Sequence, residues 1–85
     1  MATIIANHKV KNYVTWKRVY DAGSWRREAA GLKEIKVSGT SDDPNHVYMI
    51  WETNDLEKFK KMMEDPDLKA KEEEGVVISH TVTTI

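Results

Sequence analysis

Cysteine is absent from this chain of 85 residues, which excludes disulfide bonds, thiolate nucleophiles and cysteine-ligated zinc or iron–sulfur sites. Long apolar runs are absent too, and no segment approaches the ~20 apolar residues of a membrane span. The first residues lack the basic start and the apolar run of a signal peptide. We therefore expect a soluble, cytoplasmic protein with no membrane partner.

An excess of charge of one sign is also missing. The net charge is −1, and the 13 lysine and arginine residues are spread along the chain. The basic patch of a nucleic-acid-binding protein is therefore missing, and we expect no nucleic-acid partner. No helical pair of histidine and glutamate replaces the missing cysteines as metal ligands, and no nucleotide or flavin motif is present. We expect neither a metal nor a cofactor.

What the chain does contain is an alternation of strand and helix patterns. Its length suits one domain over residues 1–85, near the size at which one core only marginally offsets chain entropy. The expected strands are residues 2–11, 32–39, 46–53 and 76–85, and the expected helices are residues 13–30, with a break at Gly23-Ser24, 54–64 and 66–74. The order β-α-β-β-α-β predicts an α+β fold with a four-stranded antiparallel sheet and helices on one face.

Local patterns predict the details of three of these elements. Asn54 followed by Glu57 is the signature of a capping box, which opens the third helix at Asn54. Alternation in the second strand places Ile35 and Val37 together on one face. The charged run 69–74 is interpreted as a solvated helix face.

The strands offer apolar side chains to both faces of the predicted sheet. The third strand, for example, places Val47 and Met49 on one face and Tyr48 and Ile50 on the other. Helices cover only one face, so the other is expected to be covered by a second copy of the chain in a symmetric homodimer. The alternative is a monomer whose outer face is polar enough to be exposed to water.

Short segments along almost the whole chain carry a resemblance to a known family. They are residues 8–13 (HKVKNY) leading to 16–17 (WK), 30–33 (AGLK), 41–45 (SDDPN), 51–52 (WE), 55–58 (DLEK), 65–69 (DPDLK) and 75–76 (GV). With these segments the chain resembles the dimeric α/β-barrel superfamily, and within it the short antibiotic-biosynthesis-monooxygenase-like or cyclase-like proteins.

The resemblance implies two ferredoxin-like protomers whose sheets face each other as a dimeric α/β barrel, each with its own pocket between sheet and helices. Family members with assigned activities oxidise aromatic polyketides without a cofactor, cyclise polyketides, isomerise lactones or degrade haem. The resemblance also implies that Trp16 and a polar residue of the first strand are rough counterparts of pocket residues in the family.

Two histidines are the candidate catalytic residues. His8 shares a strand face with Ala6 and Val10, which should point toward the helices, and an imidazole there can act as an acid or a base near neutral pH. If the first and last strands pair antiparallel, His80 lies on the same face at a diagonal distance of ~7–8 Å. The alternative, a partly buried histidine satisfied by a hydrogen bond, is an equally common explanation.

Aromatic, methionine and amide side chains are the candidates for binding a substrate. The residues in this set are Asn7, Trp16, Tyr20, Trp25, Met49, Trp51 and Met63. Large flat rings and adaptable thioethers either fill a small core or line an apolar cavity. The amide of Asn7 suits a carbonyl or enolate group. However, Asn7 directly precedes His8 in the strand and so lies on the opposite face of the sheet, which favours a position in the dimer barrel.

Three classes of function remain open. The first is a cofactor-independent enzyme, monooxygenase- or cyclase-like, acting on a planar apolar or polyketide-like substrate in a pocket between sheet and helices. The second is a non-catalytic module that binds a small apolar or aromatic ligand in the same pocket. The third is a dimeric structural domain whose aromatic residues are only core.

Overall fold

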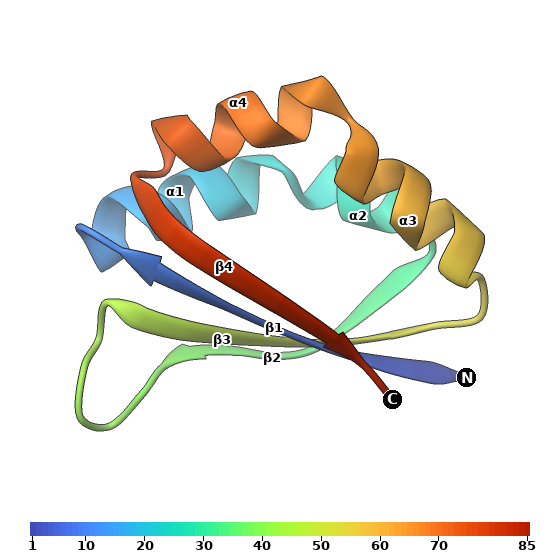
Figure 1. The fold of residues 1–85 in the computed structure, drawn as a ribbon, viewed down its shortest axis with the longest axis horizontal. Helices are drawn as coiled ribbons and strands as arrows, with labels where there is room; N and C mark the ends of the chain where they lie inside the picture. The colour runs from blue at the N-terminus through green and yellow to red at the C-terminus, as the bar shows by residue number, and fades with distance from the viewer.

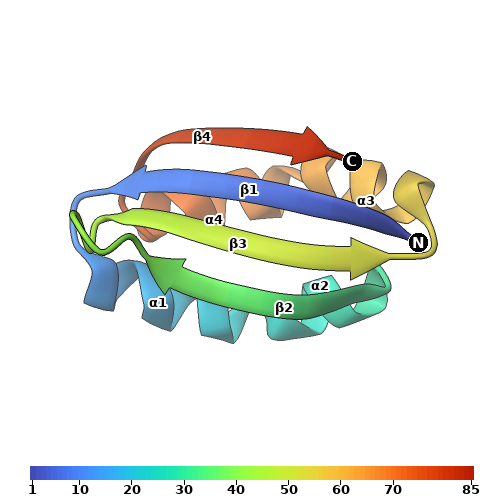
Figure 2. The same cartoon turned by 90° about the horizontal axis from the view of Figure 1, so that it is seen from below.

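The computed structural model describes residues 1–85 and has a sheet on one side and helices on the other (Figure 1). The strands are β1 (Ala2–Val10), β2 (Leu32–Gly39), β3 (His46–Thr53) and β4 (Val77–Thr84), and the helices are α1 (Tyr13–Ala22), α2 (Ser24–Ala29), α3 (Leu56–Glu64) and α4 (Pro66–Glu74). The strands pair antiparallel in the order β2-β3-β1-β4 (Figure 2). The predicted ferredoxin-like architecture is confirmed.

Both breaks expected in the helical segments are present, and each has a local cause. At the end of α1, the N–H of Gly23 donates to the carbonyl of Tyr20 at 3.1 Å, which closes the helix with a tight turn. Between α3 and α4, Asp65 is extended and Pro66 opens the next helix, where its missing N–H has no cost. None of the four helices has the length and apolarity needed to cross a membrane.

Two local predictions are wrong. The N-cap of α3 is Asp55, whose carboxylate accepts from the N–H of Lys58 at 3.2 Å, and not Asn54. Ile35 is the extra residue of a β-bulge, because the pairing to β3 shifts between Glu34 and Lys36. The bulge reverses the alternation, so Ile35 is exposed while Val37 packs against the core.

The core lies between the helices and the inner face of the sheet. Alternate residues of β1 and β3 supply the floor, namely Ile4, Ala6, Val10, Val47, Met49 and Trp51. The helix side contributes Trp16, Tyr20, Ala30, Phe59 and Met62. The predicted orientation of Ala6 and Val10 toward the helices is therefore confirmed, and in β3 the face with Val47 and Met49 is the inward one.

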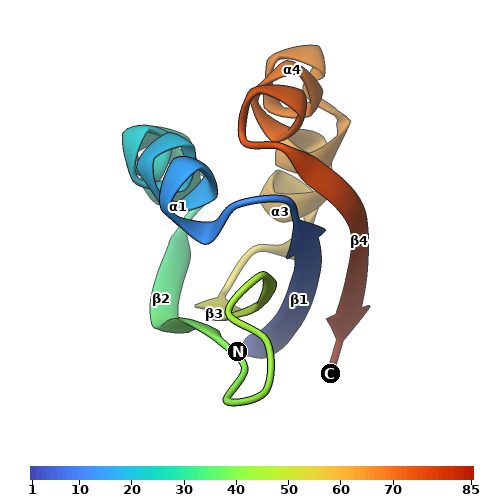
Figure 3. The same ribbon diagram turned by 90° about the vertical axis from the view of Figure 1, so that its left-hand side faces the viewer.

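No helix covers the outer face of the sheet (Figure 3). At its centre Ile5 of β1 pairs with Ile50 of β3, and both side chains are partly exposed. Tyr48 of β3 lies on the same face and is 39% exposed, and Ile35 at the bulge of β2 is 48% exposed. This leaves an apolar patch in the middle of an otherwise polar face.

Candidate functional site

A cavity with a free volume of about 70 Å³ lies between the sheet and the helices. Its floor comes from β1, β3 and β4, and its walls come from all four helices. The lining residues are Ala6, His8, Trp16, Val19, Tyr20, Gly23, Arg26, Arg27, Met49, Trp51, Met62, Met63, Leu68, Lys71, Glu72, Gly75, Val77 and Val82. Mostly apolar walls with a few polar groups are the usual character of a small-molecule site.

His8 and Trp16 form a hydrogen-bonded pair in this cavity. The indole N–H of Trp16 donates to Nδ1 of His8 at 3.1 Å, with the two rings edge-on at 85°. Trp16 is buried and His8 is partly buried. Burial, and to a lesser extent the charge of His80, lowers the pKa of His8 from 6.5 to about 4. His8 is therefore a neutral imidazole at neutral pH.

His80 lies directly opposite His8 in the pairing of β1 with β4. The predicted diagonal placement is therefore wrong, because the two histidines form a direct cross-strand pair with ring centroids 5.9 Å apart. Nδ1 of His80 is 3.4 Å from a carboxylate oxygen of Glu72 on α4. The His80 side chain is 48% exposed and that of Glu72 is 18% exposed. The two histidines therefore connect the cavity to the protein surface.

Tyr20 is held by a second hydrogen-bond network at the other end of the cavity. Its hydroxyl donates to the carboxylate of Glu34 at 2.8 Å and accepts from the indole N–H of Trp51 at 3.1 Å. The guanidinium of Arg27 lies 3.6 Å from the centre of the ring. Burial raises the pKa of Tyr20 above its ordinary value, although the Trp51 hydrogen bond and the charge of Arg27 oppose the shift. The phenol therefore stays protonated and has no donor left for a ligand.

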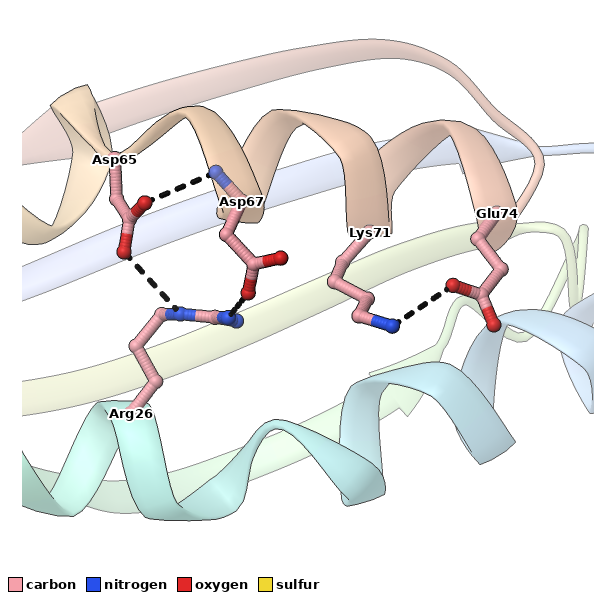
Figure 4. Close-up of polar contacts among 5 residues, drawn as sticks. All are labelled: Arg26, Asp65, Asp67, Lys71 and Glu74. Atoms are coloured by element: carbon pink, nitrogen blue, oxygen red, sulfur yellow. Dashed lines mark hydrogen bonds and ion pairs between the residues drawn. The ribbon is translucent and has the colours of Figure 1, made fainter.

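Arg26 connects the helix pair α1 and α2 to the helix pair α3 and α4 across the cavity (Figure 4). From α2 it forms an ion pair with Asp67 in the first turn of α4, and its Nε lies 3.8 Å from the carboxylate of Asp65. Its side chain is only 8% exposed, and Nε has no hydrogen-bond partner. Lys71 and Glu74, also drawn in Figure 4, pair with each other at 3.0 Å on α4. We call Arg26, Asp65 and Asp67 the Arg26 bridge.

Most of the predicted site residues come together in the structure. The cavity is lined by His8, Trp16, Tyr20, Met49, Trp51 and Met63. His80 does not line it, but lies in an adjoining shallow hollow on the surface with Met63 and Val82, which line both.

Asn7 and Trp25 do not reach the cavity. Asn7 lies on the outer face of the sheet, where its amide oxygen is 3.3 Å from Nε2 of His46, because successive strand residues point to opposite faces. Trp25 is 61% exposed, and the guanidinium of Arg26 lies 4.8 Å from its ring centre. The residue that α2 buries is Arg26, and its neighbour along the helix points about 100° away.

Four charged cavity residues were missed by sequence reasoning: Arg26, Arg27, Lys71 and Glu72. Arginines in a short polar helix are ordinarily solvated, so no signal singled out the first two. Glu72 belongs to the run 69–74 that was predicted to be a solvated face, and it is the one partly buried member. Its position four residues after Leu68, which also lines the cavity, is the spacing that could have indicated it.

By sequence, the chain matches no family model and no curated protein. By structure, it matches a candidate antibiotic biosynthesis monooxygenase from Caulobacter crescentus with a TM-score of 0.78 and 10% identity, over 99% of this chain and 86% of that one. A candidate antibiotic biosynthesis monooxygenase from Deinococcus radiodurans matches with a TM-score of 0.76 and 12% identity, over 100% of this chain and 90% of that one.

A NIPSNAP family protein of unknown function from Agrobacterium tumefaciens is also similar. Its TM-score is 0.74 at 16% identity, over 100% of this chain and 86% of that one. At such low identities the likeness shows the fold alone. The expected resemblance to monooxygenase-like proteins is therefore confirmed at the level of the fold.

Proposed function

We propose that the protein binds a small, planar, apolar molecule in the cavity and acts on it as a cofactor-independent enzyme of the monooxygenase or cyclase type. The cavity carries the proposal, because aromatic and thioether walls surround a few polar groups near His8. The fold shared with the candidate monooxygenases from Caulobacter and Deinococcus supports the class of chemistry. In this proposal His8 acts on the reacting atoms, supported by His80, whose ring lies 5.9 Å away just outside the cavity.

The size of the cavity limits what can bind. Its free volume of about 70 Å³ is well below the roughly 300–1,000 Å³ of pockets that hold drug-sized ligands. A ligand of a few heavy atoms fits between the helix pairs as they stand. A polyketide-sized substrate requires α4 to move away from α1, and the Arg26 bridge resists that movement.

The second candidate function is a non-catalytic structural or ligand-binding module. The small free volume favours it, because a nearly filled interior also serves as a core. The two candidates share the fold and differ in whether a ligand enters the cavity and reacts there.

Binding is tested by NMR titration with phenol, and with the larger 1-naphthol, which requires α4 to move, following the indole N–H signals of Trp16 and Trp51. We expect saturable shifts for both signals. Val82→Phe should fill the cavity and abolish them, whereas Val14→Phe should not, because Val14 is 75% exposed. The absence of saturable shifts in the unmodified protein would favour the structural module.

Catalysis is tested by oxygen uptake with 1-naphthol in the absence of any added cofactor. The enzyme proposal expects uptake that depends on protein concentration and falls in a variant with both His8→Gln and His80→Gln. Binding without oxygen uptake or any conversion of the phenol would favour the non-catalytic ligand-binding module.

We further propose that residues 1–85 act as one protomer of a dimeric α/β barrel. The patch around Ile5 and Ile50 on the uncovered sheet face supports this arrangement. Pairing two such faces buries both patches, which a chain of this size cannot do alone.

A further inference from the structure

The hydrogen bond from Trp16 determines where the proton of neutral His8 lies. An indole nitrogen can only donate, so Nδ1 of His8, 3.1 Å away, must accept and carries no proton. A neutral imidazole then has its proton on Nε2. Protonation of Nδ1 would break the bond to Trp16 and place a charge in a mostly apolar cavity.

Nε2 of His8 is the neutral donor that remains available. It has no hydrogen-bond partner in the protein. It is also accessible to solvent, because Nε of Arg26 is the only fully buried side-chain nitrogen or oxygen without a partner. The ring of His80 lies 5.9 Å away, centre to centre, without a hydrogen bond to it.

The other neutral donors in the cavity are already committed. The hydroxyl of Tyr20 donates to Glu34, and the indole of Trp51 donates to Tyr20. Of the cations, Arg26 is held in its bridge, although its Nε has no hydrogen-bond partner, and Lys71 pairs with Glu74 at 3.0 Å. Arg27 stacks on the ring of Tyr20 at 3.6 Å.

We propose that Trp16 holds His8 as the Nε2–H tautomer, and that this N–H donates to the carbonyl oxygen of a small ketone, aldehyde or lactone in the cavity. A neutral ligand with one acceptor oxygen on an apolar body matches the one free neutral donor among mostly apolar walls. The inference rests on the proposed function, since it names the substrate class of the same cavity. It makes His8 the group that orients and polarises the carbonyl, because its one lone pair is taken by Trp16.

The tautomer is tested by long-range ¹H–¹⁵N correlation of the histidine rings at pH 7. We expect Nε2 of His8 to carry the proton and Nδ1 to be unprotonated. Trp16→Phe should give a mixture of tautomers, whereas Trp51→Phe should leave His8 unchanged, since it removes an indole hydrogen bond from the same cavity but not the one to His8. A proton on Nδ1 in the unmodified protein overturns the inference without any variant.

The ligand class is tested with cyclobutanone and methylenecyclobutane, which have nearly the same shape and differ in oxygen against CH₂. We expect the ketone to bind about fivefold more tightly, as one ordinary net hydrogen bond provides. The preference should shrink in Trp16→Phe, in which only part of His8 carries its proton on Nε2.

The outcomes separate this inference from the proposed function. Equal affinity for the two probes means that the donor role of His8 is wrong while the cavity still binds small molecules. If neither probe binds, the carbonyl class is wrong, and the titration with phenol and 1-naphthol decides separately whether the cavity binds any ligand.

Discussion

At the scale of single residues, the neutral state of His8 depends on two features of its surroundings. Burial disfavours the imidazolium, and the lone pair of Nδ1 is engaged by Trp16. Both features also couple His8 to the stability of the fold, because the unfolded chain offers neither of them.

Stability should therefore fall in acid as His8 becomes protonated. The pKa of His8 is about 4 in the folded chain and near 6.5 in the unfolded chain, so the unfolded state binds more protons between these values. Stability is retained above pH 6.5 and lost toward pH 4, by up to about 3 kcal/mol. Urea denaturation at pH 7 and pH 4.5 measures the loss, which His8→Gln should reduce.

The matched control for this prediction is His46→Gln, which removes a histidine from the opposite face of the sheet. It should leave the loss of stability in acid unchanged. If the unmodified protein and His8→Gln lose stability equally in acid, protonation of His8 is not the cause of the loss.

Trp16 and Trp25 provide a second comparison at this scale. Trp16 is 3% exposed and stacks on Tyr20 with ring centres 4.9 Å apart, whereas Trp25 is 61% exposed. Trp16→Ala should lower the free energy of unfolding by about 3–5 kcal/mol, and Trp25→Ala by about 0.5 kcal/mol or less. Chemical denaturation of both variants tests this, and comparable losses would show that burial is not the deciding factor.

At the scale of secondary-structure elements, the two helix pairs are separate units that meet over the cavity. The Arg26 bridge joins α2 to the start of α4, at the point where Asp65 caps the helix by accepting from the N–H of Asp67 at 2.9 Å. One acidic cluster therefore both begins α4 and holds it against the other helix pair.

Asp67→Asn should weaken this connection. The guanidinium of Arg26 is almost buried while Asp67 is 56% exposed, so the expected loss of about 1–3 kcal/mol lies between those of surface and buried ion pairs. Amide hydrogen exchange in α4 should accelerate as well. Glu74→Gln, which removes the exposed pair with Lys71, is the control and should cost about 0.5 kcal/mol or less. Equal effects of the two variants would show that the bridge has no special role.

At the scale of the whole molecule, the uneven covering of the sheet is the main feature. All helices lie on one face (Figure 3), and the opposite face has Ile5 and Ile50 paired at its centre. Exposed apolar patches of this kind mark association surfaces in proteins that otherwise bury such residues.

The dimer should be detected by size-exclusion chromatography with light scattering as about twice the chain mass of 9.8 kDa. Because association stabilises the folded state, the melting temperature should rise with protein concentration. Ile50→Lys should give a monomer, whereas Ile78→Lys, at an exposed position of β4, should remain dimeric. A monomer at micromolar concentration in the unmodified protein would contradict the barrel.

The sequence by itself determined the order of the elements and how the residues of β1 and β3 divide between the two faces of the sheet. Alternation in β1 and β3 places Ile4 and Met49 toward the core, and Gly23 and Pro66 interrupt helical patterns at predictable positions. These features follow from local rules, since backbone conformation and residue periodicity act over a few neighbouring residues. His8 and Trp16 could be singled out for the same reason.

Only the tertiary structure decided the chemistry of the cavity. The bond between Trp16 and His8, the direct pairing of His8 with His80 and the bridge from Arg26 to Asp67 all depend on register and helix packing. The bulge at Ile35 likewise changes which side chains of β2 face inward, and no local sequence pattern predicts it. Contacts between residues far apart in the chain are set by how whole elements pack, which periodicity within one element does not specify.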